Sequence, residues 1–482
     1  MILRVINHKF HYEMENLCRV FYPDETIRVI KDSGDETDGI TVTTTLSGEY
    51  TVGVKVDING VTENEEKSVE KYDDCEREMA ILLFSLLSSI TGYIPKWGIL
   101  TGVRPSKLMN TLINDYGEDG AKKYFTDKLL VCDKKTELAM SVAKAEEKIM
   151  AISNEKSFSL YVSIPFCPTR CNYCSFVSHS IAQAKKLLPE YVDRLCDEIR
   201  LTATIANELD LRLESIYWGG GTPTTLSAAE LQRICNEINS GFDLSHLREY
   251  TIEAGRADTV TPEKLEVIKK AGVGRISINP QTFNDRVLEM IGRRHSVADV
   301  IRVFGEARRI GFDNINMDLI AGLTGDTFDS FCNSVDKAIE LAPENITLHT
   351  LALKRSSTIV THGVDVQNGE IANKMLEYAQ DKFYCAGYKP YYMYRQSRSL
   401  GNLENVGWCK EGFECLYNVF MMEECHTVLA VGAGAVTKLK DPYSRNIERI
   451  FNFKYPYEYN SRYEMIAQRK EKIREFYSEI TG

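Results

Sequence analysis

The chain has 482 residues, of which 43% are hydrophobic and 26% are charged, a composition typical of a globular protein with two or three domains. Its net charge of −11 disfavours a nucleic-acid backbone as the main partner, because such binding needs a positive field. The longest uncharged run, Met79–Ile94, is shorter than the roughly 20 residues of a membrane span, and Met1–Phe10 lacks the apolar segment of a secretory signal. We therefore expect a cytoplasmic protein with no membrane segment and no nucleic-acid partner.

The first 155 residues alternate short strand-like and helix-like patterns without a regular βα rhythm, which predicts an N-terminal α+β domain over residues 1–155. Strands are expected at Met1–Val5 and Glu49–Asp57, and helices at Asp74–Ser89 and Thr136–Ala151. The turn-rich stretch Trp97–Pro105 is interpreted either as a connector between helices or as a surface for docking or substrate.

From Phe158 onward, short buried apolar runs alternate with amphipathic helical patterns. The expected strands are Leu160–Ile164, Ile216–Trp218, Tyr250–Ala254, Arg275–Asn279, Asn316–Ala321 and Thr347–Leu351. The expected helices between them are Glu190–Leu209, Ala228–Asn239, Pro262–Ala271, Val297–Ile310 and Thr327–Leu341. Six βα units in series predict an α/β fold with a partial (βα)6 barrel over residues 156–360, and such sheets place their chemistry at the C-terminal strand ends.

After residue 360 the regular alternation weakens, and residues 361–482 are expected to form a mixed C-terminal extension that contributes to a substrate site. A helix is expected at Ile371–Cys385, followed by an aromatic strand at Tyr391–Tyr394 and a segment rich in glycine and asparagine. The last forty residues are expected to be helical and charged.

Three cysteines, Cys167, Cys171 and Cys174, follow the first strand of the predicted barrel with the spacing C-x3-C-x2-C. Thiolates are preferred ligands of iron–sulfur clusters, and three of them can hold three irons of a four-iron cluster and leave the fourth open. The same spacing would suit one helix face, but Pro165 and Pro168 disfavour a regular helix here. Random placement of the thirteen cysteines predicts about 0.01 matches to this spacing. The three thiols are therefore the expected catalytic and metal-binding residues.

Other metal sites are also conceivable from the sequence. A zinc site at the same three cysteines would need a fourth ligand, for which His179 is the nearest candidate. Cys409, Cys415 and Cys425, the last of them followed by His426, could be imagined as a second cluster site, but their spacing is loose, and buried packing is the simpler interpretation. In a reducing compartment, thirteen cysteines favour thiolate ligation or packing over disulfides.

The cysteine spacing, with Tyr173 before the last cysteine, resembles the radical S-adenosylmethionine (SAM) superfamily. This resemblance implies a [4Fe–4S] cluster whose open iron binds the amino and carboxylate groups of SAM. In that family, reduction of the cluster by a low-potential donor of the flavodoxin or ferredoxin type cleaves a carbon–sulfur bond and gives a 5′-deoxyadenosyl radical. The cofactor performs the difficult step, and the protein contributes placement and shielding.

Polar and glycine residues at later strand ends suggest where SAM binds. Gly219, Gly220, Gly221 and Thr222 follow the second strand, where glycine lets the backbone approach a ligand closely. Carboxylates or amides can hydrogen-bond the ribose hydroxyls of SAM, and a guanidinium can bind its carboxylate. Each such residue alone is more often an ordinary polar residue at the edge of the core. In the resembling family, the residues that contact SAM match Tyr161, Glu253, Gln281, Arg293 and Asp318, and those that flank the adenine match Tyr173 and Ile320.

Longer stretches of the chain resemble one group of that superfamily, the oxygen-independent coproporphyrinogen III oxidases. The similar stretches are Leu160–Cys167, Tyr217–Pro223, Thr261–Ile278 and Asp318–Leu323. Further stretches resemble the HemZ-type coproporphyrinogen dehydrogenases, namely Gly98–Lys107, Tyr394–Gln396, Gly401–Gly407 and Met421–Val436. The resemblance implies oxidative decarboxylation of coproporphyrinogen III to protoporphyrinogen IX in anaerobic heme biosynthesis.

Such a tetracarboxylate substrate needs cations and flat apolar walls. The candidates are Arg256, Lys354, Arg355, Arg395 and Arg398 for the carboxylates and Tyr391, Tyr392 and Tyr394 for the macrocycle, with surface ion pairs as the alternative for each cation. Ser175 and Phe176 stand where the single-domain branch of the group has glycine and a further cysteine, and heme chaperones share a similar aromatic residue there. A heme chaperone, or a radical SAM enzyme acting on another tetrapyrrole, therefore stays open as an alternative.

Overall fold

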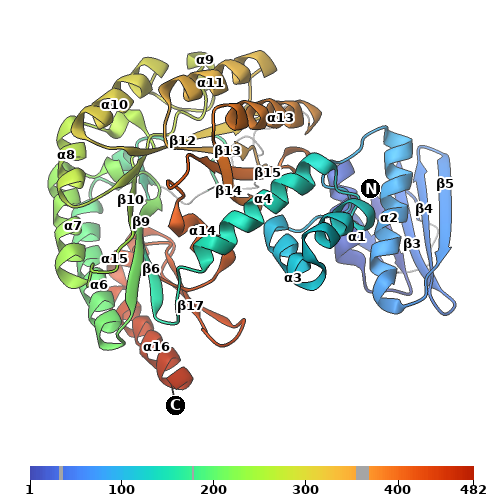
Figure 1. Cartoon of the computed structure of the whole chain (residues 1–482), viewed down its shortest axis with the longest axis horizontal. Helices are drawn as coiled ribbons and strands as arrows, with labels where there is room; N and C mark the ends of the chain where they lie inside the picture. The colour runs from blue at the N-terminus through green and yellow to red at the C-terminus, as the bar shows by residue number, and fades with distance from the viewer. Residues whose placement is uncertain (32–35, 176–178, 354–368, 482) are drawn as a thin grey trace. The chain divides into compact units, whose positions relative to one another are not determined.

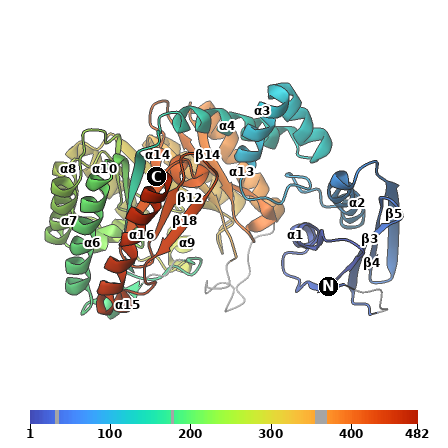
Figure 2. The same cartoon turned by 90° about the horizontal axis from the view of Figure 1, so that it is seen from below.

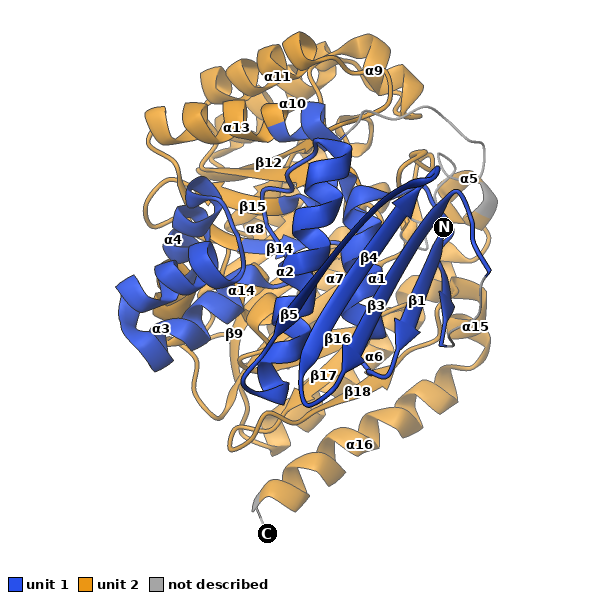
Figure 3. Cartoon of the chain, turned by 90° about the vertical axis from the view of Figure 1, so that its right-hand side faces the viewer, with its two compact units in different colours: residues 1–143, 368–373, 393–404 blue, residues 144–367, 374–392, 405–482 orange. Residues whose placement is uncertain are grey.

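The structure, a computed structural model, describes residues 1–31, 36–175, 179–353 and 369–481. The chain forms two compact units, which Figure 3 shows in different colours. Unit 1 contains residues 1–143, 368–373 and 393–404, and unit 2 contains residues 144–367, 374–392 and 405–482. The division into segments 1–155, 156–360 and 361–482 that the sequence suggests stays a prediction.

Unit 1 is built on a five-stranded sheet. In spatial order its strands are β2 (Arg28–Ile30), β1 (Ile2–Ile6), β3 (Ile40–Ser47), β4 (Thr51–Ile58) and β5 (Val61–Ser68). Helices α1 (His11–Phe21) and α2 (Tyr72–Thr91) lie on the same side of this sheet (Figure 2). The core between them is aliphatic, because alternate residues of β4 such as Val52, Val54 and Val56 point inward to meet Met79 and Leu83.

The remaining helices of unit 1 are α3 (Pro105–Lys123), the π-helical turn η1 (Tyr124–Lys128) and most of α4 (Asp133–Met150). A polar cluster is buried among them. Lys135 forms an ion pair with Glu404, and both side chains are at most 1% exposed. The indole Nε1 of Trp97 donates a hydrogen bond to the other oxygen of Glu404 at 2.8 Å. Burial disfavours the Glu404 carboxylate, but Lys135 and Trp97 outweigh this effect and lower its pKa.

Unit 2 contains most of an eleven-stranded sheet (Figure 1). In spatial order its strands are β14 (Lys389–Arg395), β15 (Glu404–Cys409), β13 (Asn345–Thr350), β12 (Asn314–Ala321), β11 (Arg275–Ser277), β10 (Glu249–Glu253), β9 (Arg212–Gly220), β6 (Ser157–Ile164), β16 (Thr427–Val431), β17 (Val436–Lys440) and β18 (Ile447–Phe451). The run from β13 to β6 is parallel throughout, and β16 is parallel to β6. β7 (Phe166–Cys167) and β8 (His179–Ser180) form a separate small pair.

The helices that connect the parallel strands line the outer side of the curved sheet (Figure 1). The helices of unit 2 are α5 (Ile181–Ala184), α6 (Leu188–Glu208), α7 (Ala228–Gly241), α8 (Pro262–Lys270), α9 (Asp285–Met290), α10 (Val297–Ile310), α11 (Phe328–Leu341), most of α13 (Gly369–Cys385), α14 (Leu416–Glu423), α15 (Pro456–Ser461) and α16 (Tyr463–Thr481), with 3-10 turns η2 (Pro223–Thr225) and η3 (Ala257–Thr259). The 3-10 turn η4 (Leu400–Asn402) belongs to unit 1. Local signals set several starts: Ser227 caps α7 and Ser296 caps α10, each in a reciprocal capping box.

The six predicted parallel strands and the partial barrel are confirmed, with strand ends that shift by a few residues. The predicted helix at 371–385 and strand at 391–394 are confirmed as α13 and β14. The expectation that the last forty residues are helical is wrong in part, because β18 lies at Ile447–Phe451 and pairs with β17. Among the described residues, no helix is both long and apolar enough to cross a lipid bilayer.

The buried ion pair of unit 1 leads to a prediction on stability. Lys135→Met leaves the buried Glu404 carboxylate without its cation, so the free energy of unfolding should fall by about 3–5 kcal/mol. The double variant K135M/E404L removes both charges and should recover most of that loss. Lys134→Met, at an exposed neighbouring lysine, is the matched control. Urea unfolding followed by circular dichroism measures all three, and equal stability of K135M and wild type would contradict the prediction.

Candidate active site at the C-terminal strand ends

The three cysteines of the C-x3-C-x2-C sequence lie on one loop that follows β6. Cys167 belongs to the short strand β7, which pairs with β8 and so folds the far end of the loop back onto its start. Cys171 is buried, whereas Cys167 and Cys174 are partly exposed. The backbone N–H of Cys174 donates to the carbonyl of Cys171 at 3.1 Å, which makes a tight turn between the two. The loop therefore presents three thiols that are partly shielded from solvent.

The glycine segment at the end of β9 is bound to this loop through its backbone. The N–H of Gly221 donates to the Ile164 carbonyl at 2.8 Å, and the N–H of Thr222 donates to the Phe166 carbonyl at 2.7 Å. A side chain cannot fit at Gly221, because a Cβ there would lie 2.5 Å from the Phe166 oxygen. The Thr222 hydroxyl lies 3.5 Å from the Cys167 sulfur. The glycine segment and the cysteine loop thus form one layer.

Arg256 lies beneath the cysteine loop. It is 3% exposed, and its Nη1 donates to the Thr169 carbonyl at 3.2 Å, to the Thr169 hydroxyl at 2.9 Å and towards the Cys171 sulfur at 3.8 Å. Asp258 balances the buried charge through an ion pair of 2.8 Å. The sequence suggested Arg256 for substrate carboxylates, but these contacts engage its guanidinium with the loop that carries the thiols.

Arg293 reaches the same region from the turn after α9. Its Nη1 donates to the carbonyls of Asn279 at 2.7 Å and Gly255 at 3.2 Å, and its Nη2 donates to the Tyr173 hydroxyl at 3.3 Å. Among the described residues, the buried Arg293 Nε and the buried Asn279 Oδ1 have no hydrogen-bond partner. A buried donor and acceptor without partners are costly, so their presence indicates a polar ligand at this position.

Glu253 ends β10 beside Gly219. Its Oε1 accepts a hydrogen bond of 2.5 Å from the Tyr217 hydroxyl and would lie 3.3 Å from a Cβ on Gly219. Burial raises the pKa of Glu253 to about 7, and the Tyr217 hydrogen bond limits that rise. The carboxyl group can therefore change its charge near neutral pH.

An aromatic stack supports Tyr217. The ring of Tyr417, on α14, stacks on Tyr217 with centroids 4.5 Å apart and on Tyr161 with centroids 6.0 Å apart. The sequence predicted a SAM contact for Tyr161 but assigned nothing to Tyr217 or Tyr417. No local signal pointed to Tyr417, because α14 comes about 200 residues after Tyr217 and reaches it only through the tertiary fold.

Asp318 lies on β12, and Gln281, in the segment that follows β11, forms an isolated parallel bridge to Leu319 of the same strand. Burial disfavours the Asp318 carboxylate, but hydrogen bonds from His349 and Asn316 prevail and lower its pKa. Gln281 has a left-handed backbone with φ of 68°, and it exchanges backbone hydrogen bonds with Asp318 and Ile320 at 2.9 and 3.0 Å. A non-glycine residue in this conformation is uncommon and is often found at ligand sites. The side chain of Ile320 is 6% exposed.

The residues present fit a [4Fe–4S] cluster and SAM. Three thiols on one loop supply the soft donors that such a cluster prefers, and Arg256 and Thr222 lie within hydrogen-bonding range of two of the sulfurs. Among the described residues, no three His, Cys, Asp or Glu side chains are arranged to hold a single metal ion. The unpartnered nitrogen of Arg293 and oxygen of Asn279 suit a charged, hydrogen-bonding cofactor.

Other residues noted in the sequence have different surroundings. Cys415 is buried and its thiol donates to Glu249, while burial lowers the pKa of His426 to about 3 and keeps its imidazole neutral. Tyr391 and Tyr392 are buried, and Tyr394 is only partly exposed. Arg395 and Arg398 belong to unit 1, so they are described with that unit below. Lys354, Arg355 and Phe176 lie outside the described residues.

The family model of the radical SAM superfamily matches residues 161–338, a range that contains every cluster and SAM residue expected from the sequence. Over 97% of its length the chain is 34% identical to the oxygen-independent coproporphyrinogen-III oxidase-like protein HemZ of Bacillus subtilis, and the match covers 96% of that protein. It is also 39% identical to the heme chaperone HemW of Bacillus subtilis, over 41% of this chain and 51% of that protein.

Among solved structures, the coproporphyrinogen III oxidase HemN of Escherichia coli shares the fold with a TM-score of 0.52 and 21% identity. That match covers 67% of this chain and 73% of the other chain. Fold, family model and the nearly full-length relative agree with each other. The chain therefore belongs to the radical SAM superfamily, in the group of oxygen-independent coproporphyrinogen-III oxidase-like proteins, and its cofactors are a [4Fe–4S] cluster and SAM.

Proposed function

We propose that the protein catalyses the oxidative decarboxylation of coproporphyrinogen III to protoporphyrinogen IX in the cytoplasm. Each of two propionate side chains would lose a β-hydrogen atom, then CO2 and one electron, and become a vinyl group. The observation that carries the proposal is the 34% identity to HemZ over nearly the whole of both chains, which includes unit 1 and the C-terminal strands as well as the barrel. A reducing compartment suits a chain with thirteen cysteines and an iron–sulfur cofactor.

In this proposal, Cys167, Cys171 and Cys174 hold the cluster. The SAM residues are Tyr161, Tyr173, Gly219, Gly220, Gly221, Thr222, Glu253, Gln281, Arg293, Asp318 and Ile320. When bound and reduced, the two cofactors together supply a carbon-centred radical that can abstract a hydrogen atom from an unactivated carbon.

The protein residues would position these groups and limit solvent access. The Arg293 guanidinium already uses its two Nη groups on Asn279, Gly255 and Tyr173, so its free Nε is the group we assign to the SAM carboxylate. Glu253, held by Tyr217, would accept hydrogen bonds from ribose hydroxyls when it is ionised. Arg256 would stabilise the thiolate of Cys171 by its charge.

A second candidate function is heme trafficking without turnover of a porphyrinogen. It is favoured by the matches to heme chaperones named HemW, at 39% identity for Bacillus subtilis and 30% for Lactococcus lactis, the latter over 62% of this chain. These matches cover less of the chain than the match to HemZ does, so we place this function second. Stoichiometric retention of heme, with no deoxyadenosine released in response to a porphyrinogen, would favour it.

The decarboxylase proposal can be tested by assay of the reconstituted protein without oxygen. Given SAM, a low-potential reductant and coproporphyrinogen III, it should release 5′-deoxyadenosine and convert the substrate to products lighter by one and two CO2, as followed by mass spectrometry. Cys171→Ala should abolish both signals because the cluster loses a ligand. Cys385→Ala, at an exposed cysteine, is the matched control and should leave both unchanged. Deoxyadenosine without any change in the porphyrinogen would refute the substrate assignment.

The pKa of Glu253 predicts how SAM affinity depends on pH. Because this pKa lies at about 7, protonation below neutral pH removes the charged acceptor, and SAM should bind up to about tenfold more weakly at pH 6 than at pH 8. Glu253→Gln should flatten this profile. Tyr217→Phe removes a hydrogen bond that lowers the pKa of Glu253, so the pH at which SAM affinity changes should move upward. Equilibrium dialysis of labelled SAM measures the three profiles, and an unchanged pH dependence in E253Q would contradict the assignment.

The close packing at Gly221 predicts a strong effect of one methyl group. Gly221→Ala would place a Cβ 2.5 Å from the Phe166 oxygen and 2.7 Å from the Ile164 oxygen, and so break the link between glycine segment and cysteine loop. We expect this variant to take up little iron and sulfide on reconstitution. Gly274→Ala, where a Cβ meets nothing within 4 Å, should reconstitute as wild type does. Iron and sulfide analysis measures the cluster content of both variants. Full cluster content in G221A would show that the contact between the glycine segment and the cysteine loop is dispensable.

A further inference from the structure

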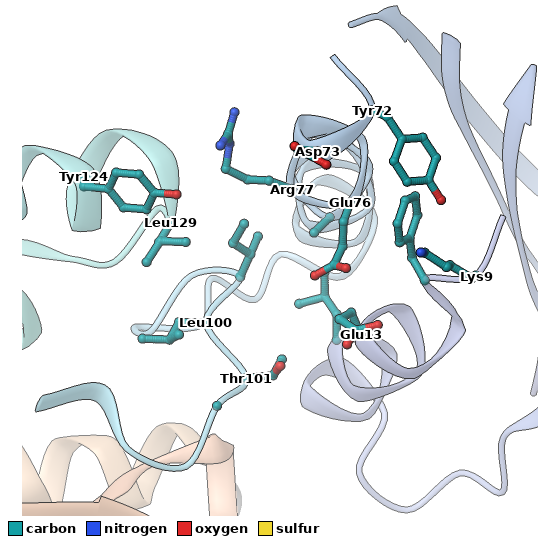
Figure 4. Close-up of a pocket in the computed structure, with 15 residues that line it drawn as sticks. Lys9, Glu13, Tyr72, Asp73, Glu76, Arg77, Leu100, Thr101, Tyr124 and Leu129 are labelled. Atoms are coloured by element: carbon teal, nitrogen blue, oxygen red, sulfur yellow. The ribbon is translucent and has the colours of Figure 1, made fainter. Parts of the chain in front are cut away.

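Two cavities of unit 1 differ in the charges that line them. The larger, of about 530 Å³, mixes the cations Lys9 and Arg77 with three carboxylates, and Figure 4 shows Glu13 and Glu76 pointing into it. The smaller, of about 190 Å³, lies between α1 and the segment that follows β14. Its lining contains three arginines and amide and hydroxyl side chains, and none of the described residues that line it is an aspartate or glutamate. This smaller cavity is called the arginine cavity below.

Arg395 is the most buried of the three arginines that line the arginine cavity. It is 3% exposed, its Nη2 donates to the Leu100 carbonyl at 2.6 Å, and its guanidinium lies over the Trp97 ring at 5.3 Å. Among the described residues, its Nε and Nη1 are buried without a hydrogen-bond partner. Two unused donors on a buried cation are costly, and either of them can donate a charge-assisted hydrogen bond to an oxygen of a carboxylate or phosphate.

The nearest carboxylate does not compensate this charge. Glu404 accepts hydrogen bonds from Lys135 and Trp97, and its electrostatic effect on Arg395 is smaller than the effect of burial. Burial therefore dominates and lowers the pKa of Arg395 to about 9. An anion bound at the free edge of the guanidinium would restore the pKa by supplying the missing opposite charge.

Two further arginines lie at the mouth of the cavity. Arg19, on α1, is half-buried and is paired with Glu15 one turn away. Arg398 is exposed, has a left-handed backbone with φ of 65°, and forms no ion pair within the described part of the chain. Asn402 also has a left-handed backbone, which is uncommon for residues other than glycine, and Arg398, Gln396 and Asn402 all line the cavity.

The size of the cavity limits the ligand. Drug-sized molecules occupy pockets of about 300–1,000 Å³, and 190 Å³ is below that range. A whole macrocycle is therefore excluded, whereas a phosphate or a short carboxylate arm fits. We propose that the arginine cavity is a binding site for a small oxyanion, a phosphate or carboxylate group, with Arg395, Arg19 and Arg398 as its cationic donors. This site stands on the geometry of unit 1 and does not rest on the proposed function.

Titration calorimetry on the reconstituted full-length protein tests this site. Inorganic phosphate and propionate are the probes, and each titration is compared with a titration of chloride at the same ionic strength. We expect at least one of them to bind with one-to-one saturation and to change tryptophan emission over the same concentration range, because Trp97 lies against Arg395. Saturation by phosphate alone identifies a phosphate ester as the natural ligand class, and saturation by propionate alone identifies a carboxylate-bearing molecule.

Variants separate the site from general charge effects. Arg398→Gln should weaken binding about tenfold or more because it removes one charge-assisted contact, while its melting temperature in chloride stays that of wild type because the side chain is exposed. Arg395→Lys keeps a charge but loses the planar fork and should weaken binding as well. Arg445→Gln, at an exposed arginine of unit 2, is the matched control.

Two results would overturn the proposal: no binding of either anion beyond chloride in the wild type, or equal losses in R398Q and R445Q. Decarboxylation of coproporphyrinogen III is measured separately on the same preparations. Anion binding that persists in a protein without decarboxylase activity supports the site and refutes only the proposed function. Decarboxylase activity in a protein that binds neither anion supports the proposed function and refutes the anion site.

Discussion

The candidate site depends on the parallel pairing of β6 with β9. This pairing brings Ile164 opposite Gly220, and two backbone hydrogen bonds extend it past both strand ends, from Gly221 to Ile164 and from Thr222 to Phe166. The sheet itself therefore joins the cysteine loop to the glycine segment through backbone hydrogen bonds, and side chains such as Arg256 add further contacts to the loop. A loop held in this way can present three thiols in a fixed arrangement while its own side chains remain available for ligands. Any residue larger than glycine at position 221 would disturb that arrangement at its centre.

Two buried guanidiniums complete the layer around the thiols. Burying a cation is unfavourable unless hydrogen bonds and opposite charge compensate it. Arg256 meets this requirement with Asp258 and Thr169, and Arg293 meets it in part with backbone carbonyls and Tyr173. The difference between them is informative, because Arg256 is engaged by the protein, whereas Arg293 keeps an unpartnered Nε. One arginine thus shapes the loop, and the other keeps a donor for a ligand.

Much of the barrel could be predicted from the sequence, because the βα rhythm, the cysteine spacing and the glycine segment are local patterns. The strands themselves are also local patterns, so the sequence alone could place Glu253 at the end of β10 and Asp318 within β12. Their roles toward SAM stay predictions. The contacts made by Arg256 and the stacking of Tyr417 could not be foreseen, since both depend on segments that meet only in the tertiary fold. Of the strands after β15, β16 was missed for the same reason, because its partner β6 lies far away in the chain. β17 and β18 pair with each other as neighbours in the chain, and they were missed as well.

The pairing of β16 with β6 has a consequence for the order of events during synthesis. β6 is the first strand of the barrel, but its second neighbour comes near the C-terminal end, and the Ser159–His426 hydrogen bond that accompanies this pairing spans 267 residues. Contacts so distant in sequence form late, because closing a long loop is slow and the partner must first leave the ribosome. The loop that carries Cys167, Cys171 and Cys174 is therefore translated long before the wall beside it exists. Assembly of the metallocofactor in its final environment must then follow synthesis of β16, so iron and sulfide meet a chain that already extends past residue 431.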